Sequence, residues 1–189
     1  LPLSVLPLAM TLPDSAWSAT YVLLLLWTGA LSTAVGFLLW IGVLRFLTAV
    51  LCTIPGAWRL DGVPRLRQRP VGPLVQALRQ LGADVKCVGG EGLAPIEIVG
   101  GWLRGGSVAL DAGESSQFLS ALLLAGLGAR EPLEVTVARL TSRPYVDLTL
   151  EAIGATGGRA SRRGDRFRVE PGPVRGGVYR VEPDLSSAG

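Results

Sequence analysis

The sequence predicts an α/β protein in which short strands and helices alternate, preceded by an apolar segment. Residues 1–44 contain one charged residue, Asp14, whereas residues 45–189 hold all 18 basic residues and the other 14 acids. After residue 45, β-branched runs bounded by glycine pairs alternate with runs whose apolar residues recur every three or four positions. These are the patterns of strands and of amphipathic helices. A length of 189 residues suits one domain or slightly more.

The apolar segment is a candidate transmembrane helix. Ala16–Leu44 carries no charge, and residues 21–44 are long enough to cross a hydrocarbon core of about 30 Å. A buried core helix is the alternative. Arginines such as Arg45 and Arg59 follow the segment, so the positive-charge bias predicts a cytoplasmic C-terminal part with possible membrane association through residues 21–44. No basic region precedes the segment, which argues against a signal peptide.

Composition excludes several kinds of site. The chain has no histidine, so catalysis, metal ligation and pH switching by a histidine side chain are excluded. Cys52 and Cys87 have neither CxxC nor zinc-finger spacing. We therefore predict buried free thiols in a reducing compartment.

Asp61–Val85 combines an arginine cluster with a helix signal. Arg65, Arg67 and Arg69 alternate, so an extended segment would direct the three guanidinium groups to one side, which suits a small anion. A solvated loop is the alternative. A helix is predicted next, because Gly72-Pro73 begins it, leucines at 74, 78 and 81 form an apolar stripe, and Gly82 ends it.

The remaining chain predicts further strands and two helices. Phe118–Leu127 is apolar on nearly every side, which indicates a helix enclosed by other elements. Tyr145–Ile153 predicts a second helix, with Leu148 and Ala152 directed inward. The predicted strands are Asp84–Val88, Ile96–Val99, Ser107–Leu110, Leu133–Val137, Phe167–Glu170 and Val178–Glu182.

Arg159–Arg168 holds five arginines in ten residues. Such a run could be a nucleic-acid patch. However, only Phe167 is available there for base stacking, and the whole chain has one lysine. We predict a solvated hairpin and no nucleic-acid partner.

Four stretches in order resemble one family. The string LDGVPRLRQRPVGPLVQALRQLGA at 60–83 is similar to the signature of the EPSP synthase (3-phosphoshikimate 1-carboxyvinyltransferase) family, which has a D/E-G-x-P-R-M-x-x-R-P-[IV]-G run before such a helix. LDAGESSQFLSALLLA at 110–125, LTSRPYVDLTLEAI at 140–153 and VEPDLSSAG at 181–189 also resemble the family. The resemblance covers about Arg45–Gly189. Residues 1–44 instead resemble, weakly, a helix of drug/metabolite-transporter proteins.

The resemblance implies a fold of βαβαββ repeats, three of which pack buried parallel helices inside an outer sheet as an inside-out α/β barrel domain. This chain would hold about two of the three. The expected organisation is an apolar leader at 1–44, an incomplete first, shikimate 3-phosphate-binding domain at 45–177, and the start of a truncated second domain at 178–189.

The resemblance also implies a substrate site. By motif, shikimate 3-phosphate contacts fall on Ser115, Ser116, Gln117, Ser142 and Tyr145, and a phosphoenolpyruvate contact falls on Arg69. From the residues alone, a serine at a helix start is either a cap or part of an anion site. Arg45 matches the arginine of the family's N-x-G-T-x-x-R motif, but other residues replace Asn, Gly and Thr. No catalytic residue and no metal ligand is expected.

The implied reaction transfers the enolpyruvyl group of phosphoenolpyruvate to the 5-hydroxyl of shikimate 3-phosphate. No cofactor is expected. We expect a monomer that is inactive as these 189 residues alone, because the family's catalytic carboxylates and lysine lie in parts that the resemblance does not cover. Two alternatives stay open: a UDP-N-acetylglucosamine enolpyruvyl transferase, and a membrane protein with an incidental soluble part.

Overall fold

The computed structural model describes residues 44–101 and 103–176. The chain divides into two compact units, residues 1–43 and 44–189, and every described residue belongs to the second. The predicted transmembrane helix, apart from Leu44, and the predicted strand Val178–Glu182 lie outside the described residues. Within the described ranges, no helix combines the length and the apolar character needed to cross a bilayer.

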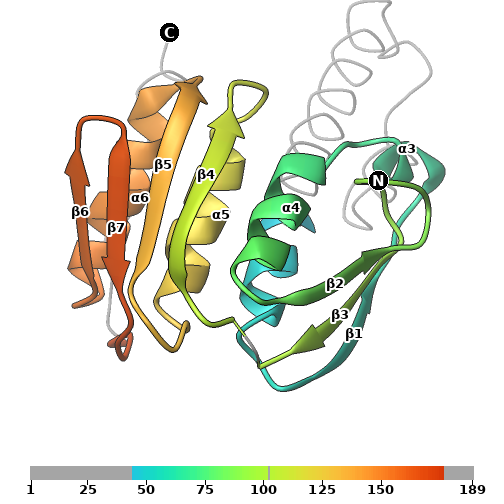
Figure 1. Cartoon of the computed structure of the whole chain (residues 1–189), viewed down its shortest axis with the longest axis horizontal. Coiled ribbons are helices and arrows are strands. Elements are labelled where there is room, and N and C mark those ends of the chain that lie inside the picture. Colours follow the sequence, from blue (N-terminus) through green and yellow to red (C-terminus); the bar gives the residue numbers. More distant parts are fainter. Residues whose placement is uncertain (1–43, 102, 177–189) are drawn as a thin grey trace, which may run out of the picture. The chain divides into compact units, whose positions relative to one another are not determined.

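The first half of this unit is a three-stranded antiparallel sheet with its helices (Figure 1). A helical segment at residues 44–51 comes first. The strand order is β1-β3-β2. The elements are β1 (Gly56–Leu60), α3 (Pro64–Arg67), α4 (Gly72–Gln80), β2 (Asp84–Cys87) and β3 (Ile96–Gly100).

The second half is a four-stranded sheet of order β4-β5-β7-β6. Strands β4 and β5 are parallel, and β7 pairs antiparallel with both β5 and β6. Helices α5 and α6 lie on one side of this sheet (Figure 1). The elements are β4 (Gly106–Ala112), α5 (Gln117–Gly126), β5 (Leu133–Leu140), α6 (Arg143–Ala155), β6 (Arg159–Arg163) and β7 (Arg166–Glu170).

The two halves repeat one topology. The second half is a complete β4-α5-β5-α6-β6-β7, and the first half follows the same sequence from its helical segment onward. Strand order β1-β3-β2 corresponds to β5-β7-β6, with antiparallel pairing throughout. The predicted α/β fold of βαβαββ repeats is confirmed, and the described part holds one complete repeat and most of another.

Helix α5 occupies the centre of the core. Eight of its ten residues are buried, and Phe118 is fully enclosed. It contacts β4, β5, β7, α4 and α6. Inward side chains of the sheet, such as Val135 and Phe167, are buried as well. Each large side chain buried in this way contributes about 1.5–3 kcal/mol to the stability of the fold. The burial of α5 confirms the prediction of an enclosed apolar helix.

Helix α4 also follows its prediction. A proline lies in its first turn, and Leu74, Leu78 and Leu81 are buried. Gly82 follows with φ of 88°, a conformation that glycine adopts without steric cost. Through its contacts with β2, β4 and α5, this helix joins the two sheets.

The predicted extended arrangement of Arg65, Arg67 and Arg69 is wrong. Pro64 begins α3, a single helical turn, because its fixed φ is already that of a helix. Leu66 turns inward and is 2% exposed, so burial of this leucine favours the turn over an extended segment. The Arg67 guanidinium forms two hydrogen bonds, of 2.8 and 2.9 Å, with the Asp61 carboxylate.

The predicted inward face of α6 is also wrong. Leu148 is 59% exposed and Ala152 is exposed, whereas Val146 and Ile153 are buried. Positions 146 and 153 are seven residues apart and share a face, and that face rather than the Leu148 face packs into the core. Helical periodicity was present on both faces, so it did not distinguish them.

The predicted thiols are free, and Cys52 is buried whereas Cys87 is half-buried. Burial raises the pKa of the Cys52 thiol to about 12. This buried thiol donates a hydrogen bond of 3.1 Å to the Thr48 carbonyl.

We predict that Leu122→Ala in α5 lowers the free energy of unfolding by about 2–5 kcal/mol, because it leaves a cavity in the core. Leu148→Ala is the matched control and should change it by no more than about 0.5 kcal/mol. Urea denaturation of the two variants measures the difference. Equal losses would show that Leu148 is buried in solution.

Candidate functional site

Arg45 joins the helical segment 44–51 to the start of α5. Its Nη1 donates to Ser115 Oγ and to Gln117 Oε1, both at 2.7 Å. Its guanidinium carbon lies 4.6 Å from the centre of the Phe118 ring. The side chain is only 8% exposed. A buried guanidinium thus organises two of the predicted site residues.

The electrostatics of Arg45 bring a third residue into the cluster. Burial lowers the pKa of Arg45, the Glu114 carboxylate opposes this shift, and the positive charge of Arg69 adds to it. Arg69 is therefore close enough for its charge to act on Arg45. The Arg45 Nε is buried without a hydrogen-bond partner among the described residues. Two guanidinium groups near the start of α5 make this region favourable for an anion.

Ser115 and Ser116 end the connection from β4 to α5, and Gln117 is the first residue of α5. Ser115 Oγ accepts a hydrogen bond of 3.3 Å from the Gln117 backbone N–H. Ser116 occupies the N-cap position and is buried, but its side chain makes no capping hydrogen bond. The helix start is therefore satisfied by Ser115 and not by a conventional cap at Ser116.

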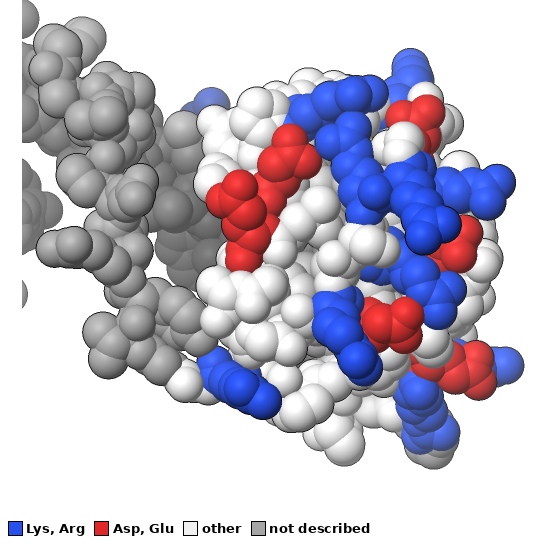
Figure 2. Space-filling view, turned by 90° about the vertical axis from the view of Figure 1, so that its left-hand side faces the viewer, with Lys and Arg blue, Asp and Glu red and all other residues white. Residues whose placement is uncertain are grey.

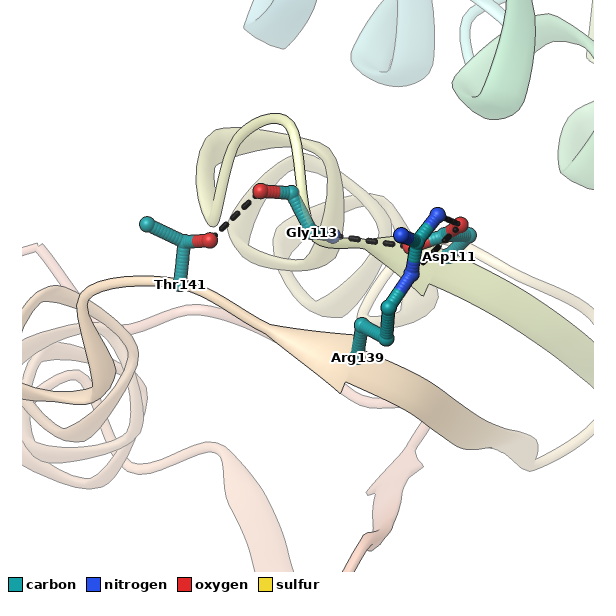
Figure 3. Close-up of polar contacts among 4 residues, drawn as sticks. All are labelled: Asp111, Gly113, Arg139 and Thr141. Carbon is teal, nitrogen blue, oxygen red and sulfur yellow. Dashed lines mark hydrogen bonds and ion pairs between the residues drawn. The ribbon is translucent and has the colours of Figure 1, made fainter.

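The connection that follows β4 is fixed through Gly113 (Figure 3). The Gly113 N–H donates to Asp111 Oδ1 at 2.9 Å, and the Thr141 hydroxyl donates to the Gly113 carbonyl at 2.5 Å. The Asp111 carboxylate also accepts hydrogen bonds from the Arg139 guanidinium. Because Thr141 follows β5, these bonds hold the loops after β4 and β5 beside each other.

Ser142 and Tyr145 begin α6. Ser142 has a left-handed backbone, with φ of 55°. The Tyr145 side chain is 66% exposed. Helices α5 and α6 follow parallel strands and are joined at their second turns by a 2.8 Å hydrogen bond between Ser120 and Thr149. The starts of the two helices therefore lie at the same end.

The structure places Ser115, Ser116 and Gln117 at the start of α5, and Ser142 and Tyr145 at the start of α6. Arg45 contacts Ser115 and Gln117, and the charge of Arg69 contributes to the lowered pKa of Arg45. Ser116 lies within the same helix start. Within residues 44–101 and 103–176, no hydrogen bond joins the side chains of Ser142 and Tyr145 to the serines or to Gln117. The same ranges hold no group of three or more His, Cys, Asp and Glu residues arranged for a metal ion.

Sequence reasoning missed the roles of four residues. Arg45 was recognised only as one position of a degraded motif, and nothing in the pattern indicated that it contacts residues 70 and 72 positions away. The bonds made by Asp111, Arg139 and Thr141 depend on the pairing of β4 with β5. The register shift between Leu110 and Asp111 in that pair is not visible in sequence either.

Comparison with known proteins identifies the family. The sequence profile of EPSP synthase (3-phosphoshikimate 1-carboxyvinyltransferase) matches residues 39–189. The 3-phosphoshikimate 1-carboxyvinyltransferase of Methanoculleus marisnigri is 47% identical over 148 residues, covering 77% of this chain and 35% of that protein. The protein of the same name from Syntrophobacter fumaroxidans is 41% identical over 183 residues, covering 93% of this chain and 40% of that protein.

A solved structure of the same family has a similar fold. EPSP synthase from Acinetobacter baumannii matches with a TM-score of 0.63 and 28% identity, over 71% of this chain and 30% of that one. The fold is thus that of an α/β protein built from βαβαββ repeats. The chain belongs to the EPSP synthase family and spans little more than a third of the length of these relatives.

The matched region begins before Arg45. The profile match starts at residue 39. The first 44 residues are nearly a quarter of the 189, so an alignment that covers 93% of the chain includes part of them. The expectation that the resemblance begins only at about Arg45 is corrected accordingly.

We predict that Asp111→Asn destabilises the protein at neutral pH but not in acid. The hydrogen bond from Arg139, which has the larger effect, and the hydrogen bond from the Gly113 N–H both lower the pKa of Asp111. Its contribution to stability is therefore complete above the unfolded pKa of about 3.9 and is lost as pH falls through the lower folded pKa. Urea denaturation at pH 7 and pH 2.5 measures this, with Asp84→Asn as control. A loss independent of pH would contradict an ionic role.

Arg45→Lys should lower the free energy of unfolding by about 1–3 kcal/mol, although it keeps the charge. A lysine ammonium lacks the planar fork that meets Ser115 and Gln117 while lying over Phe118. Arg65→Lys, at an exposed position of α3, is the matched control and should change little. Faster amide exchange at Ser115–Gln117 in Arg45→Lys alone would locate the effect. Similar denaturation curves for both variants would contradict it.

Proposed function

We propose that this chain forms part of a 3-phosphoshikimate 1-carboxyvinyltransferase. This enzyme transfers the enolpyruvyl group of phosphoenolpyruvate to the 5-hydroxyl of shikimate 3-phosphate, a step of the shikimate pathway of aromatic amino acid biosynthesis. Family membership and the names of the matched relatives support the proposal. The comparisons do not favour a UDP-N-acetylglucosamine enolpyruvyl transferase or a membrane protein with an incidental soluble part.

One observation carries the proposal most directly. Arg45 holds Ser115 and Gln117 at the start of α5, with Arg69 close enough to lower the pKa of Arg45. Hydroxyl, amide and guanidinium groups are the partners that a phosphorylated, hydroxylated substrate needs. The start of α5 adds the positive end of the helix dipole, which favours a negatively charged group.

We assign shikimate 3-phosphate to the starts of α5 and α6, where Ser115, Ser116, Gln117, Ser142 and Tyr145 would contact it. Arg69 would bind the phosphate of phosphoenolpyruvate, since a guanidinium can meet two phosphate oxygens at once. The exposed Tyr145 is free to change position when the substrate ring arrives, because its side chain is two-thirds exposed. Ser142 would contribute its hydroxyl to the phosphate.

The chemistry requires two anions to be oriented and their charge to be neutralised. The 5-hydroxyl oxygen adds to C2 of phosphoenolpyruvate while C3 gains a proton. Phosphate then leaves C2 and C3 loses a proton. No residue of the 189 is assigned as catalytic, and no metal or organic cofactor takes part in this scheme. Asp111 and Asp147 pair with Arg139 and Arg162 and are assigned scaffold roles.

The 189-residue polypeptide should bind shikimate 3-phosphate weakly and should not turn it over. It spans little more than a third of its relatives, and loss of several members of a catalytic set typically costs orders of magnitude in rate. Cytoplasmic location, monomeric state and any membrane association stay predictions.

Calorimetry with shikimate 3-phosphate, together with a phosphate-release assay with both substrates, tests the proposal. Ser115→Ala should weaken binding at least about 10-fold, the loss expected for one hydrogen bond to a charged group. Ser107→Ala, at an exposed position of β4, is the matched control. Phosphate release at ordinary enzyme rates, abolished by Arg69→Ala, would contradict the prediction of an inactive polypeptide. Equal binding by Ser115→Ala and its control would contradict the assigned site.

A further inference from the structure

The outer face of the β6–β7 hairpin contains a hollow of about 380 Å³. It is lined by Glu134, Ser161, Arg163, Arg166 and Arg168. Along β7, Phe167 and Val169 are buried toward α5, so the alternate residues Arg166 and Arg168 point to the opposite side of the sheet. Figure 2 shows basic side chains gathered on the side of the molecule that carries this hairpin. The hollow is therefore separate from the starts of α5 and α6.

The hairpin places two like charges directly opposite each other. Arg163 and Arg166 are register partners on either side of the two-residue turn. Like charges in directly opposed positions of an antiparallel pair are destabilising. An anion bound between the two guanidinium groups would remove this repulsion.

The acids beside the hollow do not balance its arginines. Glu134 is the acid that lines it, at 3.7 Å from Arg168 and 4.0 Å from Arg166. Arg168 also pairs with Glu170 at 2.8 Å. Within the described residues, Arg163 has neither an ion pair nor a hydrogen bond to its side chain. Three arginines and one glutamate give the lining a formal excess of two positive charges, and Glu170, beside it, reduces the local excess to one.

In the described part of the chain, Arg162 lies on the other face of β6 and, unlike Arg163, is bound by neighbouring residues. It donates to Asp147 at 3.2 Å and to the Gly164 carbonyl at 3.0 Å, and it lies 5.4 Å from the centre of the Phe167 ring. The inward-facing arginine of the hairpin is thus engaged by the protein, whereas the outward-facing arginines retain donors for a ligand.

We propose that this hollow binds a phosphate dianion, either inorganic phosphate or the phosphate of a small phosphomonoester. The charge of about −1.5 to −2 on such a group is opposite in sign to the excess charge of the lining. A guanidinium group can donate to two phosphate oxygens at once, and the Ser161 hydroxyl adds a further donor. A nucleic-acid strand fits less well, because Phe167 is buried and the hairpin presents no aromatic surface for base stacking.

The proposal is independent of the proposed enzymatic function, and NMR titration of the 189-residue chain tests it. Inorganic phosphate and glycerol 3-phosphate are added separately, with sodium chloride at matched ionic strength as the blank. We expect saturable amide shifts in residues 161–168 with both probes. Binding of glycerol 3-phosphate should be tighter at pH 8 than at pH 5, because the second phosphate pKa of about 6 makes the dianion dominant only at the higher pH.

Three variants sharpen the test. Arg163→Gln should weaken binding about 5-fold or more, whereas Arg159→Gln, opposite Glu170 on the same strand and outside the hollow, should weaken it less than about twofold. Glu134→Gln should tighten binding, since it removes the acid of the lining. If Arg163→Gln fails to unfold cooperatively, Arg166→Gln serves in its place.

Several results would overturn the proposal. These are an absence of saturable shifts, equal effects of Arg163→Gln and Arg159→Gln, or tighter binding of a single-stranded oligonucleotide at the same ionic strength. Shifts confined to Ser115–Gln117 would also overturn it, because the phosphate would then occupy the proposed substrate site, and the proposed function would be unaffected.

Discussion

The enclosure of α5 is the constraint on which the remaining structure depends. A helix that is apolar around its whole circumference is stable in water only if other elements cover every side. Here the four-stranded sheet, α4 and α6 provide that cover, and α4 packs against both α5 and β4. The same enclosure fixes the start of α5, so Ser115 and Gln117 meet the buried Arg45 at a position that the core determines.

Much of the fold could be predicted from the sequence, because local patterns and tertiary packing agree there. Leu74, Leu78 and Leu81 have one apolar face, and that face is buried. Prediction failed where a local pattern had two solutions. The alternating arginines before Pro70 fit an extended strand, but the burial of Leu66 favours a helical turn. In α6, two faces are apolar, and only the face of Val146 packs into the core. Strand β1 was not predicted, because nearly all of its residues are exposed and show no alternation.

The candidate site was predictable as a set of motifs but not as a set of contacts. The serine, glutamine and arginine positions were identified through their resemblance to a family, which requires no geometry. The hydrogen bonds that organise them join residues 28 to 72 positions apart, as with Thr141 to Gly113 and Arg45 to Gln117. Such bonds follow from which strands pair and in which register. A single sequence carries little information about either.

The repeated topology has a further consequence at one of the connections in which the two halves differ. The connection from β5 to α6 is Thr141–Ser142, whereas the equivalent connection from β1 to α4 runs from Asp61 to Val71 and includes α3. The entropy of closing a loop grows only slowly with its length, so this longer passage adds little cost to folding. The β1–α4 passage is therefore one place where the architecture tolerates insertion, and a scaffold redesigned for another ligand could be lengthened there while both sheets keep their strand order.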